Sequence, residues 1–243
     1  MAEKMLQVDM LKQHNSDYIM YAVEVNRNRA LPNSLDGLKT VHRRILWAML
    51  KNLGMRKPNT QKVKTMKVMG EVVGNYHPHG DGSVKGSIKH MINDFEIYMP
   101  LIDGQGSFGS MYGDDQAAER YTSICLSAYS IECLLKDLIE TTNVADFIPT
   151  YSMDDLEPKQ IPVVVPNLLI NGTSGIAVGM TTQVPKHNIV EVIDETLNVL
   201  HDPNHVVYLF PDNCTCSDII NTDFAEICNK CKGKVTMRGK IKF

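Results

Sequence analysis

The sequence predicts an α+β protein. Amphipathic patterns typical of short helices fill most of the first 140 residues, whereas β-branched residues dominate residues 161–180 and an apolar-polar alternation runs through residues 235–243. Of the 243 residues, 43% are apolar, which suits one large or two modest domains. The chain has no apolar run of the length that crosses a bilayer and no N-terminal signal pattern, so we expect a cytoplasmic protein without membrane contact.

Four short helices are expected in the first 93 residues, and the last two form a helix-turn-helix. Pro32 ends the first helix, because proline disfavours helix in the residue before it. The second carries one apolar stripe and ends at Gly54. The third and fourth are separated by the tight turn His77-Pro78-His79-Gly80. The four helices are expected at residues 16–26, 38–52, 64–75 and 80–93.

The outward face of the fourth helix carries small polar and basic side chains. Such a face is typical of a helix that enters a DNA major groove and contacts phosphates. An ordinary amphipathic surface helix explains the same pattern, so both interpretations stay open at this point. The outward residues are Ser83, Lys85, Ser87, Lys89 and His90.

Three further elements are expected after residue 127. A helix covers residues 128–138, and the acidic, turn-prone residues 151–159 mark a domain boundary. Asn171-Gly172 between apolar runs predicts a β-hairpin with a type I′ turn. Asn188 and Glu191 form a pattern similar to a capping box, and they predict the start of an amphipathic helix.

The basic charge is concentrated in residues 27–92. This segment contains 13 Lys and Arg against three acidic residues, a formal charge of +10, although the whole chain carries −3. Four of the eight histidines lie in the same segment. A polyanion is therefore the natural partner of this third of the molecule, with a solvated face that has no partner as the alternative.

Arg120 and Tyr121 place a cation beside a phenol. A tyrosine oxygen that attacks a phosphodiester needs a group to take its proton and a cation to stabilise the charge developing on phosphorus. An isolated pair of this kind is usually a packed tyrosine with a satisfied hydroxyl. The glycine-rich residues 104–109 favour the catalytic interpretation, since they allow a close-packed approach that positions the segment of Tyr121.

Three further patterns concern cofactor and metal sites. Residues 104–109 match G-x-G-x-x-G, but no helix pattern follows, so a nicotinamide or flavin site is not expected. His77 and His79 are too few to hold a metal ion and suit phosphate contact and proton transfer. Four cysteines with C-x-C and C-x₂-C spacing fit either unliganded thiols or a structural zinc site. They are Cys214, Cys216, Cys228 and Cys231.

Seven motifs together resemble the breakage-reunion subunit of bacterial type IIA DNA topoisomerases, which is the A subunit of gyrase or of topoisomerase IV. The motifs occur in order over nearly the whole chain, and this register is far more specific than any one motif. They are Arg29-Ala30-Leu31-Pro32, Asp36-Gly37-Leu38-Lys39, Val41-His42-Arg43-Arg44, Tyr76-His77-Pro78-His79-Gly80-Asp81, Asp103-Gly104-Gln105-Gly106, Arg120-Tyr121-Thr122 and Asn171-Gly172-Thr173-Ser174-Gly175-Ile176-Ala177-Val178-Gly179-Met180.

The resemblance implies a winged-helix DNA-cleavage domain over residues 1–151, with an N-terminal arm and the catalytic tyrosine. The first part of a mixed α/β tower domain follows over residues 152–243. In that family the motif tyrosine, here Tyr121, attacks one DNA strand and stays joined to its 5′ phosphate. Arg29, His79 and Arg120 align with residues around the scissile phosphate. Ile176 aligns with an apolar wedge between base pairs. The other expected DNA contacts are Lys39, His42, Arg43, Arg44, His77, Lys85 and Lys89.

The resemblance also implies partners. The expected substrate is double-stranded DNA, and the expected assembly is a homodimer within an A2B2 complex whose B-type subunit has TOPRIM and ATPase domains. That subunit would supply the Mg²⁺ and ATP sites, because this chain has neither an Asp-x-Asp motif nor a P-loop. The expected location is the bacterial cytoplasm, or the host cytoplasm for a phage protein. A non-catalytic DNA-binding or assembly module is the alternative. The strand pattern at residues 235–243 suggests a fragment or one part of a split protein.

Overall fold

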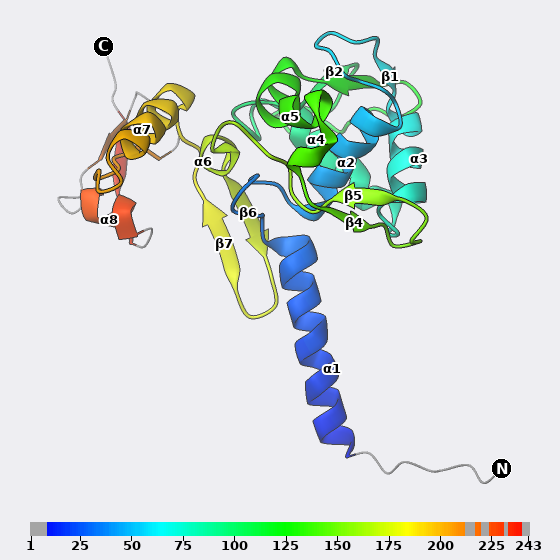
Figure 1. Ribbon diagram of the computed structural model, residues 1–243, viewed down its shortest axis with the longest axis horizontal. Helices are drawn as coiled ribbons and strands as arrows, with labels where there is room; N and C mark the ends of the chain where they lie inside the picture. Colours follow the sequence, from blue (N-terminus) through cyan, green and yellow to red (C-terminus); the bar gives the residue numbers. More distant parts are fainter. Residues whose placement is uncertain (1–8, 212–216, 220–223, 231–232, 240–243) are drawn as a thin grey trace.

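A computed structural model describes residues 9–211, 217–219, 224–230 and 233–239 (Figure 1). Helices and small antiparallel sheets make up a mixed α/β architecture, which agrees with the expected α+β class. Figure 1 shows a main body, a long N-terminal arm and a smaller C-terminal part. No described helix combines the length and the hydropathy that a membrane span requires.

Three helices form the centre of the body. They are α2 (Thr40–Lys51), α3 (Thr65–Asn75) and α4 (Asp81–Ile92). Their apolar stripes face one shared core, in which Ile45 of α2, Val72 of α3 and Ile88 of α4 are almost fully buried. The predicted helix-turn-helix is confirmed as α3 and α4 with a short turn between them.

A three-stranded antiparallel sheet packs beside these helices. Its order is β1 (Val63–Lys64), β3 (Ser123–Leu126) and β2 (Ile102–Gln105). The glycine-rich residues 104–109 form the end of β2 and the loop after it. Gly106 has a φ of +111°, and a Cβ at this position would lie 3.0 Å from Cγ2 of Thr122. The expected close packing beside Tyr121 is therefore confirmed.

The arm is α1 (Met10–Val25), which starts six residues before the predicted helix. Asp9 caps it by accepting a hydrogen bond from the N–H of Leu11 at 3.0 Å. None of the residues of α1 is buried, and the helix projects away from the body (Figure 1). It continues as the π-helical turn η1 (Asn26–Ala30), after which Leu31 is extended, so the predicted break before Pro32 is confirmed.

The region after β3 contains short elements. The predicted helix at residues 128–138 is confirmed in divided form, as η2 (Ser130–Leu134) and α5 (Lys136–Glu140). After η3 (Thr142–Val144), the strands β4 (Phe147–Pro149) and β5 (Leu156–Pro158) form an antiparallel hairpin. The predicted domain boundary after residue 151 lies in the turn of this hairpin and stays a prediction.

The prediction of a hairpin turn at Asn171-Gly172 is wrong. These residues end the short helix α6 (Asn167–Asn171), and Gly172 follows it with a φ of +62°. The hairpin consists of β6 (Thr173–Ile176) and β7 (Thr181–Val184), so its turn falls at residues 177–180. Both a hairpin turn and a helix end favour glycine at positive φ, which explains the error.

The C-terminal part centres on α7 (Ile189–His201). The side chain of Asn188 accepts a hydrogen bond from the N–H of Val190 at 2.9 Å, so the predicted cap is confirmed. Ile170, Val192 and Leu209 form a small second core. The remaining elements are β8 (Ser217–Ile219), α8 (Phe224–Lys230) and β9 (Met237–Gly239). β9 lies within the strand expected at residues 235–243, of which residues 240–243 lie outside the described residues.

Candidate nucleic-acid interface and cleavage site

Tyr121 lies at the surface, two residues before β3 begins. It is 66% exposed, and the guanidinium carbon of Arg120 lies 4.7 Å from the centroid of its ring. The next residue, Thr122, is buried, and its carbonyl oxygen accepts a hydrogen bond from the N–H of Thr65 at 3.1 Å. The hydroxyls of Thr122 and Thr65 also meet at 2.7 Å. The first residue of α3 thus holds in place a segment that presents an exposed phenol beside an exposed cation.

Two lysines of α4 lie beside this segment. Lys85 forms an ion pair with Glu119, and the hydrogen bond from Lys85 lowers the pKa of that carboxyl. Lys89 packs next to Gly109, where a Cβ would lie 3.2 Å from its Nζ. The basic face of α4 is therefore turned toward the loop that leads to Tyr121, although the charge of Lys85 is already paired.

The β6–β7 hairpin is attached to the base of the arm. The side chain of Asn26 in η1 makes two hydrogen bonds to the backbone of Val178, at 2.9 and 3.2 Å. Lys39 donates to the carbonyl oxygen of Ser174 at 2.6 Å, and burial lowers its pKa. Ile176 is 88% exposed at the end of β6. These contacts hold an exposed apolar side chain on a fixed hairpin.

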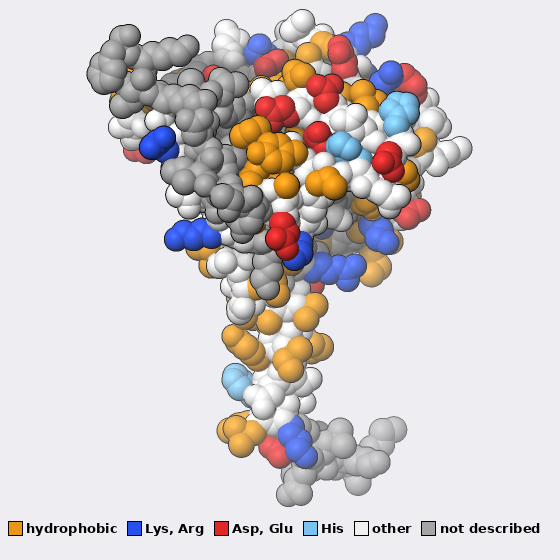
Figure 2. Space-filling model, turned by 90° about the vertical axis from the view of Figure 1, so that its left-hand side faces the viewer, with side chains coloured by type: hydrophobic (Ala, Val, Ile, Leu, Met, Phe, Trp, Pro, Cys, Tyr) orange, Lys and Arg blue, Asp and Glu red, His pale blue; other side chains and the backbone are white. Residues whose placement is uncertain are grey.

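Basic side chains gather where the arm meets the body. Figure 2 shows Lys and Arg side chains around this junction, above the apolar side chains that α1 exposes. Arg29 is exposed in η1, and Lys39 precedes α2. Lys39 bonds to the backbone of Ser174, and a Cβ at Gly175 would lie 2.4 Å from the carbonyl oxygen of Ala30, so Arg29, Lys39 and Ile176 belong to one region of the surface.

Arg43 is used inside the protein, which corrects the expectation that it lies on the DNA-facing surface. Its Nε donates to Oδ2 of Asp36 at 2.7 Å, and its Nη2 donates to Oδ1 at 3.1 Å. The side chain of Asp36 is fully buried and that of Arg43 is 9% exposed. Each of these buried charges needs the other, because loss of one partner would leave the other charge buried without a counter-charge. This pair holds the loop before α2 and occupies Nε and Nη2 of the Arg43 guanidinium.

Arg44, His77 and His79 line a groove of about 780 Å³ between η1, α2, the turn after α3 and the β4–β5 hairpin. Arg44 forms a bidentate ion pair with Glu157, with both N–O distances at 2.7 Å. The rings of His77 and His79 meet edge to face, with their centroids 4.5 Å apart. Burial lowers the pKa of His77 to about 4, and His79 and Arg44 add to the effect. His77 is therefore neutral near pH 7.

His42 is also neutral near pH 7. It stacks on His90 with 5.8 Å between the ring centroids, and Nδ1 of His90 lies 2.8 Å from a carboxylate oxygen of Glu96. Burial lowers the pKa of His42 to about 3, and the nearby His90, Lys39 and Arg43 add to this shift. His42 can offer a hydrogen bond to DNA but no positive charge, and its DNA contact stays a prediction.

The expected site residues fall into two groups. Thr65 holds the Tyr121 segment at the first residue of α3, whereas His77 and His79 follow the last turn of that helix. A helix of 11 residues is about 16 Å long. Among the described residues, no hydrogen bond, ion pair or ring contact joins Arg120 or Tyr121 to Arg29 or His79.

The described residues do not assemble a metal site. No group of three His, Cys, Asp or Glu side chains in this part of the chain is arranged to hold a metal ion. Cys214, Cys216 and Cys231 lie outside the described residues, and Cys228 is half-buried in α8. The zinc site therefore stays a prediction, and no chemical step is assigned to a metal on this chain.

The tertiary roles of two residues in this region were not identified from the sequence. Glu157 binds Arg44 across 113 residues of chain, and its only signal is an acid in a turn-prone segment, which does not name a partner. Asp36 belongs to a recognised motif, but its role as the partner of Arg43 depends on how the loop before α2 folds. Both contacts are tertiary, so local patterns do not contain them.

These features define a mixed α/β protein that presents a tyrosine-arginine pair and a basic surface. A family model for the A subunits of DNA gyrase and topoisomerase IV matches residues 29–243. The chain belongs to this family. It is 41% identical to a chloroplastic/mitochondrial DNA gyrase A protein of Nicotiana benthamiana over 98% of its length, and 43% identical to the DNA gyrase A protein of Metamycoplasma arthritidis over 96%. The chain is also 47% identical to the DNA gyrase A protein of Campylobacter jejuni over 79% of its length. The chain spans about a quarter of the length of these relatives.

Proposed function

We propose that this chain is the DNA-cleavage part of a type IIA DNA topoisomerase. The observation that carries the proposal is the exposed phenol of Tyr121 beside the Arg120 guanidinium, in a chain of the gyrase and topoisomerase IV family. A nucleophile must reach the phosphorus of a large substrate, so exposure of the phenol is what this role requires.

The proposed reaction exchanges one phosphate ester for another. The phenol oxygen of Tyr121 bonds to phosphorus as its proton passes to a base, and the 3′ oxygen of the deoxyribose leaves and takes up a proton. Arg120 and Arg29 stabilise the charge that develops on the phosphate, and His79 is the candidate proton carrier. Because the new tyrosyl ester retains the energy of the original bond, resealing the strand needs no ATP at this site.

The separation of the two residue groups supports a homodimer. Tyr121 and His79 are anchored at opposite ends of α3, so a second copy of the chain would bring the histidine group of one protomer to the tyrosine of the other. A winged-helix domain over residues 1–151 and a partial tower domain over residues 152–243 fit this proposal. The helix-turn-helix of α3 and α4 and the small sheet β1-β3-β2 support the winged-helix assignment.

The proposed complex needs other chains. Double-stranded DNA is the substrate, and a B-type subunit with TOPRIM and ATPase domains would hold Mg²⁺ and ATP in an A2B2 assembly. The exposed apolar residues of α1 offer a surface for this assembly. A non-catalytic DNA-binding module is the alternative function, and it applies if no second copy of the chain brings His79 to Tyr121.

Covalent trapping tests the proposal. The chain is mixed with a B-type subunit, Mg²⁺ and end-labelled duplex DNA, and the reaction is stopped with denaturant. A denaturant-resistant protein-DNA adduct is expected. Peptide mapping of this adduct should locate the attached nucleotide on Tyr121. Binding of DNA without any adduct would support the non-catalytic alternative.

DNA affinity should depend steeply on salt. A protein that neutralises Z phosphates releases counterions, and log K falls against log salt with a slope of about −0.9Z. Lys89→Ala should reduce this slope by about one unit. Lys136→Ala is the matched control, because Lys136 is exposed on α5 outside the basic segment. Fluorescence anisotropy at several salt concentrations measures both, and a slope near zero would contradict a phosphate-contacting surface.

Ile176→Ala should reduce DNA bending without affecting the fold. The side chain is 88% exposed, so its loss should change the free energy of unfolding by no more than about 0.5 kcal/mol. An apolar wedge compensates the cost of unstacking a base step, which is about a few kcal/mol. Energy transfer between dyes at the ends of a short duplex measures the bend. Ile176→Leu is the control that should keep it, and an unchanged bend in the alanine variant would exclude the wedge.

A further inference from the structure

The β4–β5 hairpin binds Arg44 in one orientation. The carboxylate of Glu157 accepts hydrogen bonds from Nε and Nη2 of Arg44, both at 2.7 Å. Their side chains are 5% and 19% exposed. A planar guanidinium held at two of its nitrogens cannot rotate, so the position of its third nitrogen, Nη1, is fixed as well.

The third nitrogen of Arg44 faces His77. Nη1 lies 3.2 Å from Nδ1 of the imidazole. An arginine can only donate hydrogen bonds, so Nδ1 of His77 must be the acceptor. In a neutral imidazole the proton then lies on Nε2, and a second proton on Nδ1 would point at the guanidinium.

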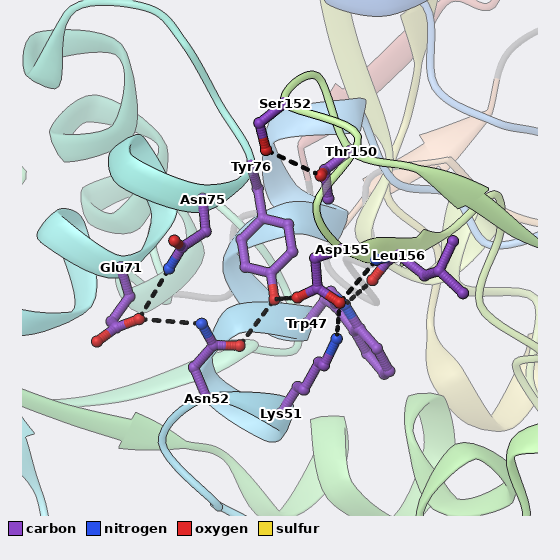
Figure 3. Close-up of polar contacts among 10 residues, drawn as sticks. All are labelled: Trp47, Lys51, Asn52, Glu71, Asn75, Tyr76, Thr150, Ser152, Asp155 and Leu156. Atoms are coloured by element: carbon purple, nitrogen blue, oxygen red, sulfur yellow. Dashed lines mark hydrogen bonds and ion pairs between the residues drawn. The ribbon is translucent and has the colours of Figure 1, made fainter.

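The same hairpin also holds the residue before His77 (Figure 3). The hydroxyl of Tyr76 donates to Oδ1 of Asn52 at 2.7 Å and reaches Oδ2 of Asp155 at 3.4 Å. Asp155 also pairs with Lys51. The indole N–H of Trp47 donates to the carbonyl oxygen of Leu156 at 3.1 Å. The two residues that precede Glu157 therefore join the hairpin to α2 and to the end of α3, next to His77.

We propose that Glu157 is a positioning residue that acts through Arg44 and presents His77 to the groove as a neutral imidazole with its proton on Nε2. This inference rests on the proposed function for its role in DNA cleavage, although the tautomer itself does not depend on it. His77 then donates a hydrogen bond to a phosphate or to its neighbour His79 and does not carry protons. Proton transfer is left to His79, whose side chain is exposed.

The charged groups around His77 agree with this assignment. Arg44 from α2 and His79 from the same turn both oppose a positive charge on His77, and burial lowers its pKa to about 4. Glu157 from β5 is occupied by Arg44. The groove also contains Glu24 from α1, Arg27 from η1, Arg43 from α2 and Lys159 after β5.

Nuclear magnetic resonance of the histidine rings tests the tautomer directly. Long-range ¹H–¹⁵N spectra of the ¹⁵N-histidine-labelled chain should show the Nε2–H form of His77 from pH 5.5 to 8, with no titration. Glu157→Ala and Arg44→Lys should each introduce the Nδ1–H form. A wild-type ring that titrates near pH 6.5, or carries its proton on Nδ1, would overturn the inference. So would an unchanged spectrum in both variants. Two variants are used because Glu157→Ala could fail to fold. Arg44→Lys keeps a positive charge at this position, so the inference can still be tested.

DNA cleavage by the complex with a B-type subunit provides the second measurement. Glu157→Gln keeps the shape of the side chain but loses the bidentate carboxylate, and misplacing His77 should slow cleavage on the order of 10- to 100-fold. Glu140→Gln is the matched control, because Glu140 is an exposed glutamate of α5, and it should not change the rate. An unchanged rate in Glu157→Gln would overturn the positioning role. A wild-type complex that never cleaves DNA would instead refute the proposed function, and the tautomer measurement would still stand.

Discussion

Tyr121→Phe is expected to abolish covalent protein-DNA adducts while DNA binding persists. The substitution removes only the hydroxyl, and no described residue makes a hydrogen bond to that oxygen. The ring, which is 66% exposed, and the Arg120 guanidinium above it can keep their places. The fold should therefore be unaffected, whereas loss of a nucleophile typically reduces the rate by more than about 10⁴-fold. Denaturing gels of labelled DNA measure the adduct, and anisotropy measures binding.

Tyr112→Phe is the matched control for this experiment. Tyr112 is 90% exposed on the same surface loop, nine residues before Tyr121, and is thus at least as accessible to DNA. Its substitution should leave adduct formation intact. Adducts that survive Tyr121→Phe but disappear in Tyr112→Phe would move the nucleophile to Tyr112, and adducts that survive both would place it elsewhere in the complex.

The helices of the body could be predicted because each has a continuous apolar stripe. The stripe of α2, for example, ends up in the shared core with the side chains of α3 and α4. The start of α1 could not be found in this way, because the helix buries no residue and its first turn is fixed by the cap of Asp9. Hydrophobic periodicity reports burial, so it fails for a helix that buries none of its residues.

The sequence predicts which residues form the site better than it predicts how they are arranged in space. Motifs identify Tyr121, Arg120, His77 and His79, but spacing alone does not reveal that the two pairs are anchored at opposite ends of α3. Periodicity places Arg43 away from the apolar stripe of α2 and so predicts an exposed cation. Its burial follows from Asp36, which the preceding loop places beside it. The partner of a charge across a fold is set by tertiary packing, which local sequence does not encode.

Asp36→Ala is expected to destabilise the protein by about 3–5 kcal/mol, because it leaves the buried Arg43 without a counter-charge. The loss extends beyond the ion pair. The Asp36 carboxylate also accepts hydrogen bonds from the N–H groups of Leu38 at 2.9 Å and Ile161 at 3.0 Å, so it joins the loop before α2 to the segment after β5. Gly37 next to it has a φ of +69°, and a Cβ there would lie 2.4 Å from the backbone nitrogen of Leu168. The Asp36-Gly37 motif thus supports a close approach of two distant segments.

Urea unfolding followed by circular dichroism measures this effect, and three further variants separate its causes: Glu226→Ala, Arg43→Met and the double variant of Asp36 and Arg43. Glu226→Ala breaks an exposed ion pair with Lys230 and should cost about 0.5 kcal/mol or less, which sets the scale for a surface pair. Asp36→Ala combined with Arg43→Met removes both buried charges and should recover part of the loss, since an apolar side chain does not need a counter-charge. If the double variant is as unstable as the sum of the two single substitutions, the two charges are not coupled. Arg43 would then not depend on Asp36 as its counter-charge, contrary to the role assigned here.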